Sequence, residues 1–288
     1  MKVFKSSLGI SNFVLSIFSV GVTGLTTVAG LSGCTSVDMS LPEPIVESPE
    51  VVGETGRGMI GLGYFNTHTV SAVNNGASRP PLLQAQDEDG GGDLSLDGDI
   101  GLFRRFQVGV RLGPITPVGL LEVKYQIWGS PLLGTETSGD TPEPESDRIL
   151  VAVFGRLGQG SRSAHGDQQS TFGPGGFPWT ATGQLGVMGA GFSLGYRIHP
   201  TFSIFTGGAF DRYHVHASVS QDPSSDGTSP GGQYAQDYDG SASTIAVGFT
   251  WGRKYTLTGY GAGTRLAWPN IDNSINFRVG LDARFILF

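Results

Sequence analysis

The feature that most constrains this chain is an alternation of apolar and polar residues with a period of two, which recurs from residue 57 onward. In the last segment, apolar residues occupy every second position from Phe277 to Leu287. Successive side chains of a β-strand point to opposite faces, so this period is typical of strands. The 3.6-residue period of a helix is absent after residue 35. The sequence therefore predicts an all-β fold.

The alternating segments are long. We predict ten strands, at residues 57–67, 93–103, 106–113, 118–128, 148–158, 180–198, 201–220, 241–253, 255–268 and 275–287. Strands of soluble sheets usually have about five or six residues, whereas a tilted strand needs about 9–11 residues to cross a bilayer. The lengths favour an antiparallel transmembrane β-barrel of about ten strands. A soluble sandwich or barrel would show the same alternation, so it remains an alternative.

The connections between these strands are of two kinds. Short ones lie near residues 104–105, 114–117, 199–200, 253–255 and 269–274, and long ones cover residues 68–92, 129–147, 159–179 and 221–240. Outer-membrane barrels have short periplasmic turns and longer outer loops. The pattern holds in the C-terminal half but is interrupted at 114–117 and 129–147. Either one strand is miscounted there or one periplasmic connection is long.

Aromatic residues near the predicted strand ends favour a membrane barrel, because such barrels carry aromatic girdles at both membrane interfaces. The residues concerned are Tyr125, Trp128, Trp179, Tyr213, Trp251, Tyr255, Tyr260 and Trp268.

Basic residues lie within the predicted strands, at Arg111, Lys124, Arg156, Arg197, Arg212, Arg265, Arg278 and Arg284. An arginine facing lipid at the midplane costs about 2–4 kcal/mol, so we expect these residues to face the lumen. There they either pair with Glu122, Asp211 and Asp282 and plug the lumen, or line an anion-favouring pore. Side chains largely fill the interior of a ten-stranded barrel, which favours plugging.

The hairpin at residues 98–128, with its runs Gly101–Phe106 and Val108–Pro114, resembles the repeat of many Gram-negative outer-membrane barrels. The chain also ends in Phe288, as such barrels often do for recognition by the insertion machinery. The apolar face of the last strand runs through Leu287 and Phe285, out of phase with that terminal residue. The resemblance implies the fold, with outer-membrane lipids and the insertion machinery as partners, and points to no single family.

The N-terminal segment is predicted to direct export. Lys2 and Lys5 precede an uncharged, largely apolar stretch that ends in Leu31-Ser32-Gly33-Cys34, the arrangement of a signal peptide. This tetrapeptide resembles the lipobox of bacterial lipoproteins, which implies cleavage before Cys34 and lipidation of that residue. A transmembrane anchor, or ordinary cleavage nearby, would explain the segment without lipidation.

The sequence thus divides into a signal peptide at 1–33, a lipidated Cys34 with a disordered tether at 34–56, and a barrel at 57–288. Three prolines and four glutamates in residues 35–55 predict an extended linker that buries no core. The expected location is the outer membrane, with a lipid anchor in the periplasmic leaflet. With an even number of strands, both chain ends then lie on the periplasmic side, and the long loops face outward.

The sequence contains one candidate catalytic pair, His216 and Ser218. The two residues share a strand face, which would bring a base near a nucleophile. The motif resembles the His-x-Ser of outer-membrane phospholipase and lipid A deacylase barrels. No third group that orients His216 is identifiable in the sequence, and polar wall residues are the simpler interpretation. His214 and His216 also share a face as two metal ligands would, but a third ligand is missing.

An acidic stretch and a glycine-rich run also resemble ligand-binding motifs, but structural roles explain both better. The acidic stretch Asp87–Asp93 lacks the register of a calcium loop, and Gly259–Gly263 lacks the strand-to-helix context of a nucleotide site, so close packing explains it better. We therefore predict no cofactor and no metal.

The composition excludes several other classes. A net charge of -7 argues against nucleic-acid binding, and a single cysteine excludes a disulfide framework. Three functions remain: a barrel with a structural, surface or narrow-channel role, a barrel that hydrolyses lipid through Ser218 and His216, and a soluble periplasmic β-domain held by its lipid. The sequence does not indicate an oligomeric state.

Overall fold

The computed structural model describes residues 35–53, 55–74, 82–85, 92–113, 118–132, 148–169, 176–221, 231–253, 255–268 and 275–287. The strands are β1 (Thr35–Pro42), β2 (Gly58–Asn74), β3 (Leu82–Ala85), β4 (Gly92–Phe103), β5 (Phe106–Leu112), β6 (Val118–Trp128), β7 (Ile149–Gln169), β8 (Gly176–His199), β9 (Phe202–Gln221), β10 (Gly232–Gly252), β11 (Tyr255–Ala267) and β12 (Ile275–Ile286). No helix in these residues is long and apolar enough to cross a membrane.

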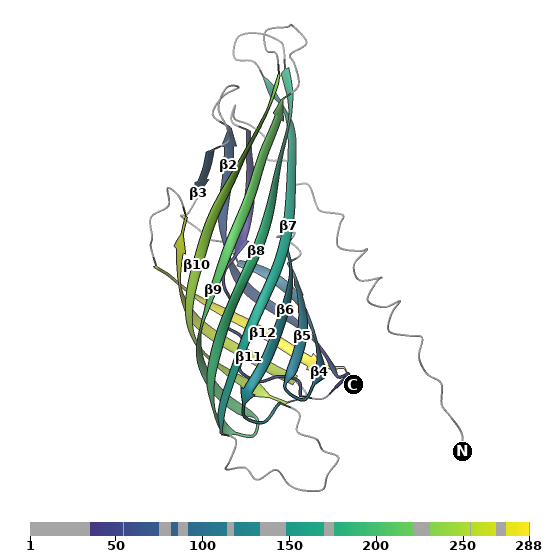
Figure 1. Cartoon of the computed structure of the whole chain (residues 1–288), viewed down its shortest axis with the longest axis vertical. Coiled ribbons are helices and arrows are strands. Elements are labelled where there is room, and N and C mark those ends of the chain that lie inside the picture. The colour runs from purple at the N-terminus through teal and green to yellow at the C-terminus, as the bar shows by residue number, and fades with distance from the viewer. Residues whose placement is uncertain are drawn as a thin grey trace, which may run out of the picture. The chain divides into compact units, whose positions relative to one another are not determined.

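Ten of these strands close into an antiparallel barrel, as the alternation predicted (Figure 1). From β4 to β12 each strand pairs with the next, and β2 pairs with both β12 and β4. Leu281 lies opposite Tyr64 on one side of β2, and Asp99 lies opposite Met59 on the other. The sheet therefore has no free edge around its circumference, which is the property that a membrane-spanning sheet requires.

The two ends of the barrel differ. We call the end with Phe103, His199 and Gly252 the turn end and the end with Asn74 and Gln221 the loop end. The β6–β7 connection, which spans residues 129–148, also lies at the turn end. The short connection at residues 114–117 joins β5 and β6 on the side of the loop end. One long connection on the side of the short turns and one short connection on the opposite side therefore explain the two interruptions in the sequence pattern, and all ten predicted strands are present.

The outside of the barrel is a band of exposed apolar side chains, which we call the apolar belt. It includes Leu62, Leu94, Leu121, Val123, Leu157, Met188, Phe192, Leu194, Ile204, Phe210, Ile245, Val247, Ile275, Phe277, Val279 and Leu281. Side chains at alternate positions in the same strands point inward, as period two requires. An exposed apolar surface of this extent is characteristic of a transmembrane barrel rather than a soluble one.

The prediction of aromatic girdles was right at one end only. Trp128, Trp251 and Tyr255 are exposed on the outer surface at the turn end. Tyr213 and Trp268, by contrast, are buried inside, where their rings lie 6.3 Å apart. Proximity to a strand end does not determine the face to which a side chain points, and the alternation does.

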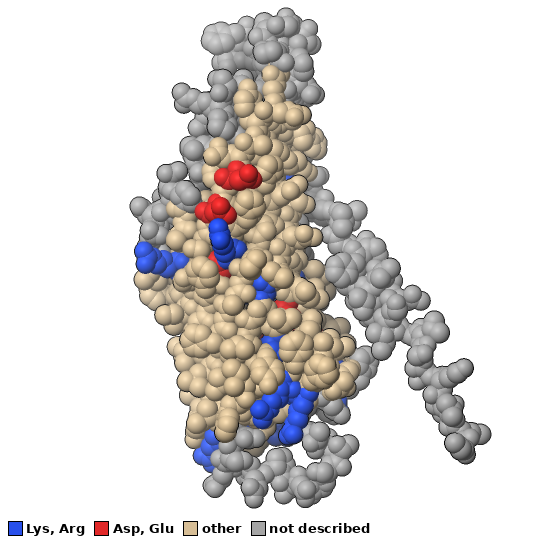
Figure 2. Space-filling model, in the orientation of Figure 1, with Lys and Arg blue, Asp and Glu red and all other residues tan. Residues whose placement is uncertain are grey.

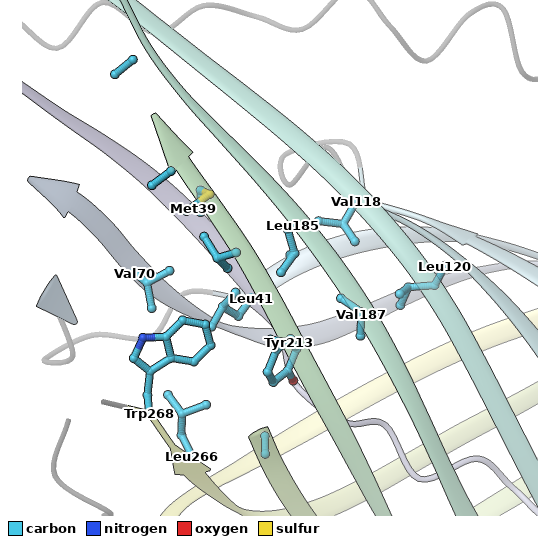
Figure 3. Packing of buried hydrophobic residues seen from close by; sticks show 14 of the residues in the cluster. Met39, Leu41, Val70, Val118, Leu120, Leu185, Val187, Tyr213, Leu266 and Trp268 are labelled. Atoms are coloured by element: carbon cyan, nitrogen blue, oxygen red, sulfur yellow. The ribbon is translucent and has the colours of Figure 1, made fainter. Parts of the chain in front are cut away.

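Strands β7 to β10 have 20 to 24 residues each and continue past the ends of β11 and β12 toward the loop end (Figure 1). The upper half of β2 pairs with both β1 and β3. Apolar side chains of β1 and β2 pack there against β8 and β9 (Figure 3). This loop-end extension thus has its own hydrophobic core, which includes Met39, Leu41, Leu185 and Tyr213.

The N-terminal segment differs from the disordered tether expected over residues 34–56. Residues 35–42 form β1, and residues 43–53, which we call the plug segment, are buried except for the half-buried Ser48. The chain enters at the loop end, where Thr35 lies opposite Asn74, and reaches the start of β2 at the turn end. The expectation that this segment begins on the side of the short turns was therefore wrong, because the segment runs through the barrel from the loop end to the turn end.

Candidate functional site

The plug segment is extended, and two of its eleven residues, Pro44 and Pro49, have no backbone N–H group. Side chains of the wall donate to carbonyl oxygens of the plug segment and of Pro42, the last residue of β1. Tyr213 Oη donates to the carbonyl of Pro42 at 2.6 Å, Arg156 to that of Ile45 at 3.3 Å and Lys124 to that of Ser48 at 3.2 Å. The inward bases thus satisfy a backbone that forms no ladder over most of its length.

Glu47 lies at the centre of this arrangement, and its side chain is 4% exposed. Its carboxylate is 2.9 Å from Arg111 Nη2, 3.5 Å from Arg284 Nη2 and 3.7 Å from Lys124 Nζ. The wall completes the network, since Arg111 also binds Asp97 at 2.8 Å. Three buried bases therefore have one shared partner on the plug segment.

Two further glutamates attach the plug segment to the wall. Glu50 accepts from Arg197 at 2.8 Å. Glu43 lies 3.2 Å from Arg278 Nε and 2.9 Å from His68 Nε2. The spacing of the three acids along the extended segment matches bases on different strands, so the ion pairs fix its register in the barrel.

Glycines on the inner wall make room for the N-terminal segment. A Cβ atom on Gly195 would lie 2.7 Å from Pro49 Cγ, and one on Gly207 would lie 2.6 Å from Val46 Cγ1 and closer still to the carbonyl oxygen of Phe192 in the wall. No Cβ fits at such distances without displacement of the segment. Part of the high glycine content, 46 of 288 residues, thus serves to hold a chain inside the barrel.

Six of the eight strand bases face inward as predicted, namely Arg111, Lys124, Arg156, Arg197, Arg278 and Arg284. Two of the expected wall partners are also found, since Arg156 binds Asp211 at 2.6 Å and Arg284 binds Asp282 through Nε at 2.6 Å. Arg212 and Arg265 instead lie on the outer face and are exposed, so their expected place in the lumen was wrong.

A cavity of about 40 Å³ lies beside the plug segment, next to Glu47, Lys124 and Tyr260. This volume is enough for two or three water molecules. The inward bases are engaged by acids and carbonyl groups, and the lumen around Glu47 is occupied by protein. The arrangement is suited to closing the barrel rather than to conducting solutes.

The His216–Ser218 pair lies on the outer face of the loop-end extension. His216 Nδ1 is 2.6 Å from Asp237 Oδ1 on β10, so a neighbouring strand supplies the orienting acid that the sequence did not reveal. Ser218 Oγ, however, shares a hydrogen bond of 2.5 Å with Thr182 Oγ1 on β8. The structure thus brings together His216 and Asp237, while Ser218 is engaged by a third residue.

His214 has the same kind of partner, with Nδ1 lying 3.2 Å from Asp239 Oδ1. Among the described residues, no group of three or more His, Cys, Asp or Glu side chains is arranged to hold a metal ion. The rings of Phe249 and Phe277 lie over Gly259 and Gly263 in β11, in agreement with the packing role expected for these glycines. Cys34 and most of Asp87–Asp93 lie outside the described residues.

No protein-family model and no curated protein matches the chain. Among solved structures, it is similar to Ail, the attachment invasion locus protein of Yersinia pestis in complex with the heparin analogue sucrose octasulfate. The identity is 10% and the TM-score 0.32, over 82% of this chain and 100% of that one. The outer membrane channel DcaP of Acinetobacter baumannii matches at 9% identity and a TM-score of 0.19, over 91% of this chain and 100% of its own.

OmpT of Vibrio cholerae matches at 9% identity and a TM-score of 0.17, again over 91% of this chain and 100% of its own. The closed antiparallel sheet of ten strands with its apolar belt is the architecture of an outer-membrane β-barrel.

Proposed function

We propose that this protein is an outer-membrane barrel that is closed by its own N-terminal segment and acts as a surface scaffold. The observation that carries the proposal is the Glu47 network, in which one buried carboxylate of the plug segment lies within 4 Å of three bases of the wall. A conducting lumen would keep such bases hydrated and accessible to ions. Here they hold a segment of the same chain.

The part that remains available to partners is the loop-end extension. Its outer face is polar, and its exposed or half-buried residues include Gln159, Ser161, Ser163, Thr180, Thr182, Gln184, His214, His216, Asp237 and Asp239. This face continues the strands of the apolar belt beyond the region that contacts lipid. A rigid polar sheet raised above the membrane supports a surface role.

Conductance across a planar lipid bilayer tests the proposal. We expect the full chain to insert without steady conductance. A variant in which residues 43–53 are replaced by a Gly-Ser segment of equal length should conduct, because the bases of the wall then face water. A steady open state of the unaltered chain would contradict the proposal, as would a silent replacement variant that is inserted and folded.

A lipid anchor at Cys34 remains part of the proposal, supported by Leu31-Ser32-Gly33-Cys34 alone. Intact-mass analysis of the mature protein should give a chain that begins at a diacylated Cys34. A free thiol there, or a chain that begins elsewhere, would contradict it.

Lipid hydrolysis is the second candidate function, and one observation favours it: Asp237 binds His216 as the acid of a catalytic triad would. The engagement of Ser218 by Thr182 speaks against it.

A further inference from the structure

Arg212 on β9 and Arg265 on β11 are the two strand bases that point away from the lumen, and both are exposed. The side chain of Arg212 is 70% exposed. An arginine on the lipid side of a barrel is costly near the midplane and costs only about 0–1 kcal/mol near the interface. Their height along the strands therefore determines what they meet.

The strand register places both arginines at the upper edge of the apolar belt. Arg265 lies opposite Ser243, which lies opposite Phe210 on the other side of β10. Phe210 is 50% exposed, and Ile245, two residues further toward the turn end, is 71% exposed. The next two outward positions of β9 toward the loop end from Arg212 are His214 and His216, which are polar. Contact with lipid therefore ends at the level of Arg212.

The two guanidinium groups flank a single strand. Arg212 lies opposite Ser241 and Arg265 opposite Ser243, so the serines of β10 stand between them. Two strand spacings separate the arginine backbones by about 10 Å across the sheet. On the face shown in Figure 2, acidic side chains in the upper half lie just above basic ones, and further basic side chains lie near the lower end.

Among the described residues, neither arginine has a strong partner. Arg212 Nη2 is 3.9 Å from Asp239 Oδ1, and both groups are largely exposed. Within the part of the chain that the structure describes, Arg265 has no hydrogen bond or ion pair. Guanidinium groups bind phosphate in a bidentate manner, and basic residues at a membrane surface attract anionic head groups.

We propose that Arg212 and Arg265, with the serines between them, bind the phosphate groups of the lipid leaflet that surrounds the loop end. This inference rests on the membrane-spanning part of the proposed function and does not depend on closure of the lumen. The occupant is a lipid because the site continues the apolar belt, so acyl chains and a phosphate contact the same strands.

The test titrates the detergent-solubilised full chain with dioctanoyl phosphatidic acid and counts bound lipid by native mass spectrometry. Dioctanoyl glycerol, which has the same acyl chains and no phosphate, is the reference probe. We expect the unaltered chain to prefer the phosphatidic acid. The double variant Arg212→Gln/Arg265→Gln should lose about fivefold in affinity for each arginine.

Two further variants and a competitor make the result specific. Arg162→Gln, an exposed change in the loop-end extension, removes one charge away from the belt and should keep the preference. The double variant Arg212→Lys/Arg265→Lys retains both positive charges and should keep most of the preference for phosphatidic acid. Inorganic phosphate alone should not displace the lipid.

Equal binding by the unaltered chain and the double Gln variant would overturn the proposal, as would an equal loss in Arg162→Gln or full displacement by inorganic phosphate. A chain that conducts but still prefers phosphatidic acid would refute the closed barrel and leave this inference standing.

Discussion

Glu47 Oε1 lies 2.9 Å from Arg111 Nη2, and this ion pair joins an extended N-terminal segment to the wall of the barrel around it. Removal of one partner of a buried ion pair leaves an uncompensated charge and costs about 3–5 kcal/mol. We therefore expect Glu47→Gln to lower the free energy of unfolding by that amount, measured by urea unfolding in detergent micelles.

An exposed pair provides the control for this variant. Asp239 and Arg212 are 60% and 70% exposed, and their charged groups are 3.9 Å apart. Because exposed pairs contribute about 0–1 kcal/mol, Asp239→Asn should change stability by less than about 1 kcal/mol. If the two variants are equally stable, the plug segment is not held by its charge.

The contact between Gly195 and Pro49 gives a second prediction. A Cβ atom on Gly195 would approach Pro49 Cγ to 2.7 Å, and a proline ring has little freedom to move aside. Gly195→Ala should therefore lower the free energy of unfolding by about 1–3 kcal/mol, the usual cost of overpacking. Gly98→Ala is the matched control, because nothing lies within 4 Å of its added Cβ.

A double-mutant cycle assigns that cost to the plug segment. Pro49→Ala removes the ring that the new methyl group would meet, so the combined variant should recover stability, with a coupling energy of about 0.5–3 kcal/mol. Purely additive effects would mean that Gly195→Ala disturbs only the wall, where the carbonyl oxygen of Ile204 lies 3.2 Å from the added Cβ.

The ten strands of the barrel were predictable because alternation with a period of two is a local property of the sequence. The same period also indicates the face of each residue, and at Arg212 it indicates the outer face, because this residue shares its parity with Ile204 and Phe210. The prediction for this residue was therefore wrong, although the sequence held the signal.

The plug segment was not predictable from local pattern. Prolines prevent it from forming a full ladder, and its glutamates are typical of a solvated linker. The available signal was long-range: the wall bases required acids in an otherwise apolar membrane region, and Glu43, Glu47 and Glu50 supply them. Charge balance between distant segments indicates such a partnership, while hydropathy does not.

Lipid hydrolysis provides a third prediction. The hydroxyl group of Ser218 shares a hydrogen bond with Thr182 Oγ1. We therefore expect Ser218→Ala to leave any lipid hydrolysis by the purified protein unchanged. Asp237→Asn, which alters the partner of His216, should be equally silent. A loss of about a hundredfold or more in either variant, the scale of acid–base catalysis, would make the hydrolase the correct interpretation.

The position of Thr35 opposite Asn74 gives the last prediction, which concerns topology. Strand β1 begins at the loop end, so residue 36 and the β9–β10 connection should face the same side of the membrane, and the β6–β7 connection the other. A membrane-impermeant maleimide should label Ser36→Cys and Ser225→Cys together in intact cells. Ser138→Cys should react only after the outer membrane is permeabilised.

Labelling of Ser36→Cys together with Ser138→Cys would contradict this arrangement and restore a periplasmic start of the chain. The expected result also constrains the proposed lipid anchor, because Cys34 precedes Thr35 by one residue. Acyl chains attached there would enter the leaflet at the loop end. The β9–β10 connection and the anchor would then belong to the same face of the membrane, and the chain would pass from that face through the barrel before its first membrane strand begins.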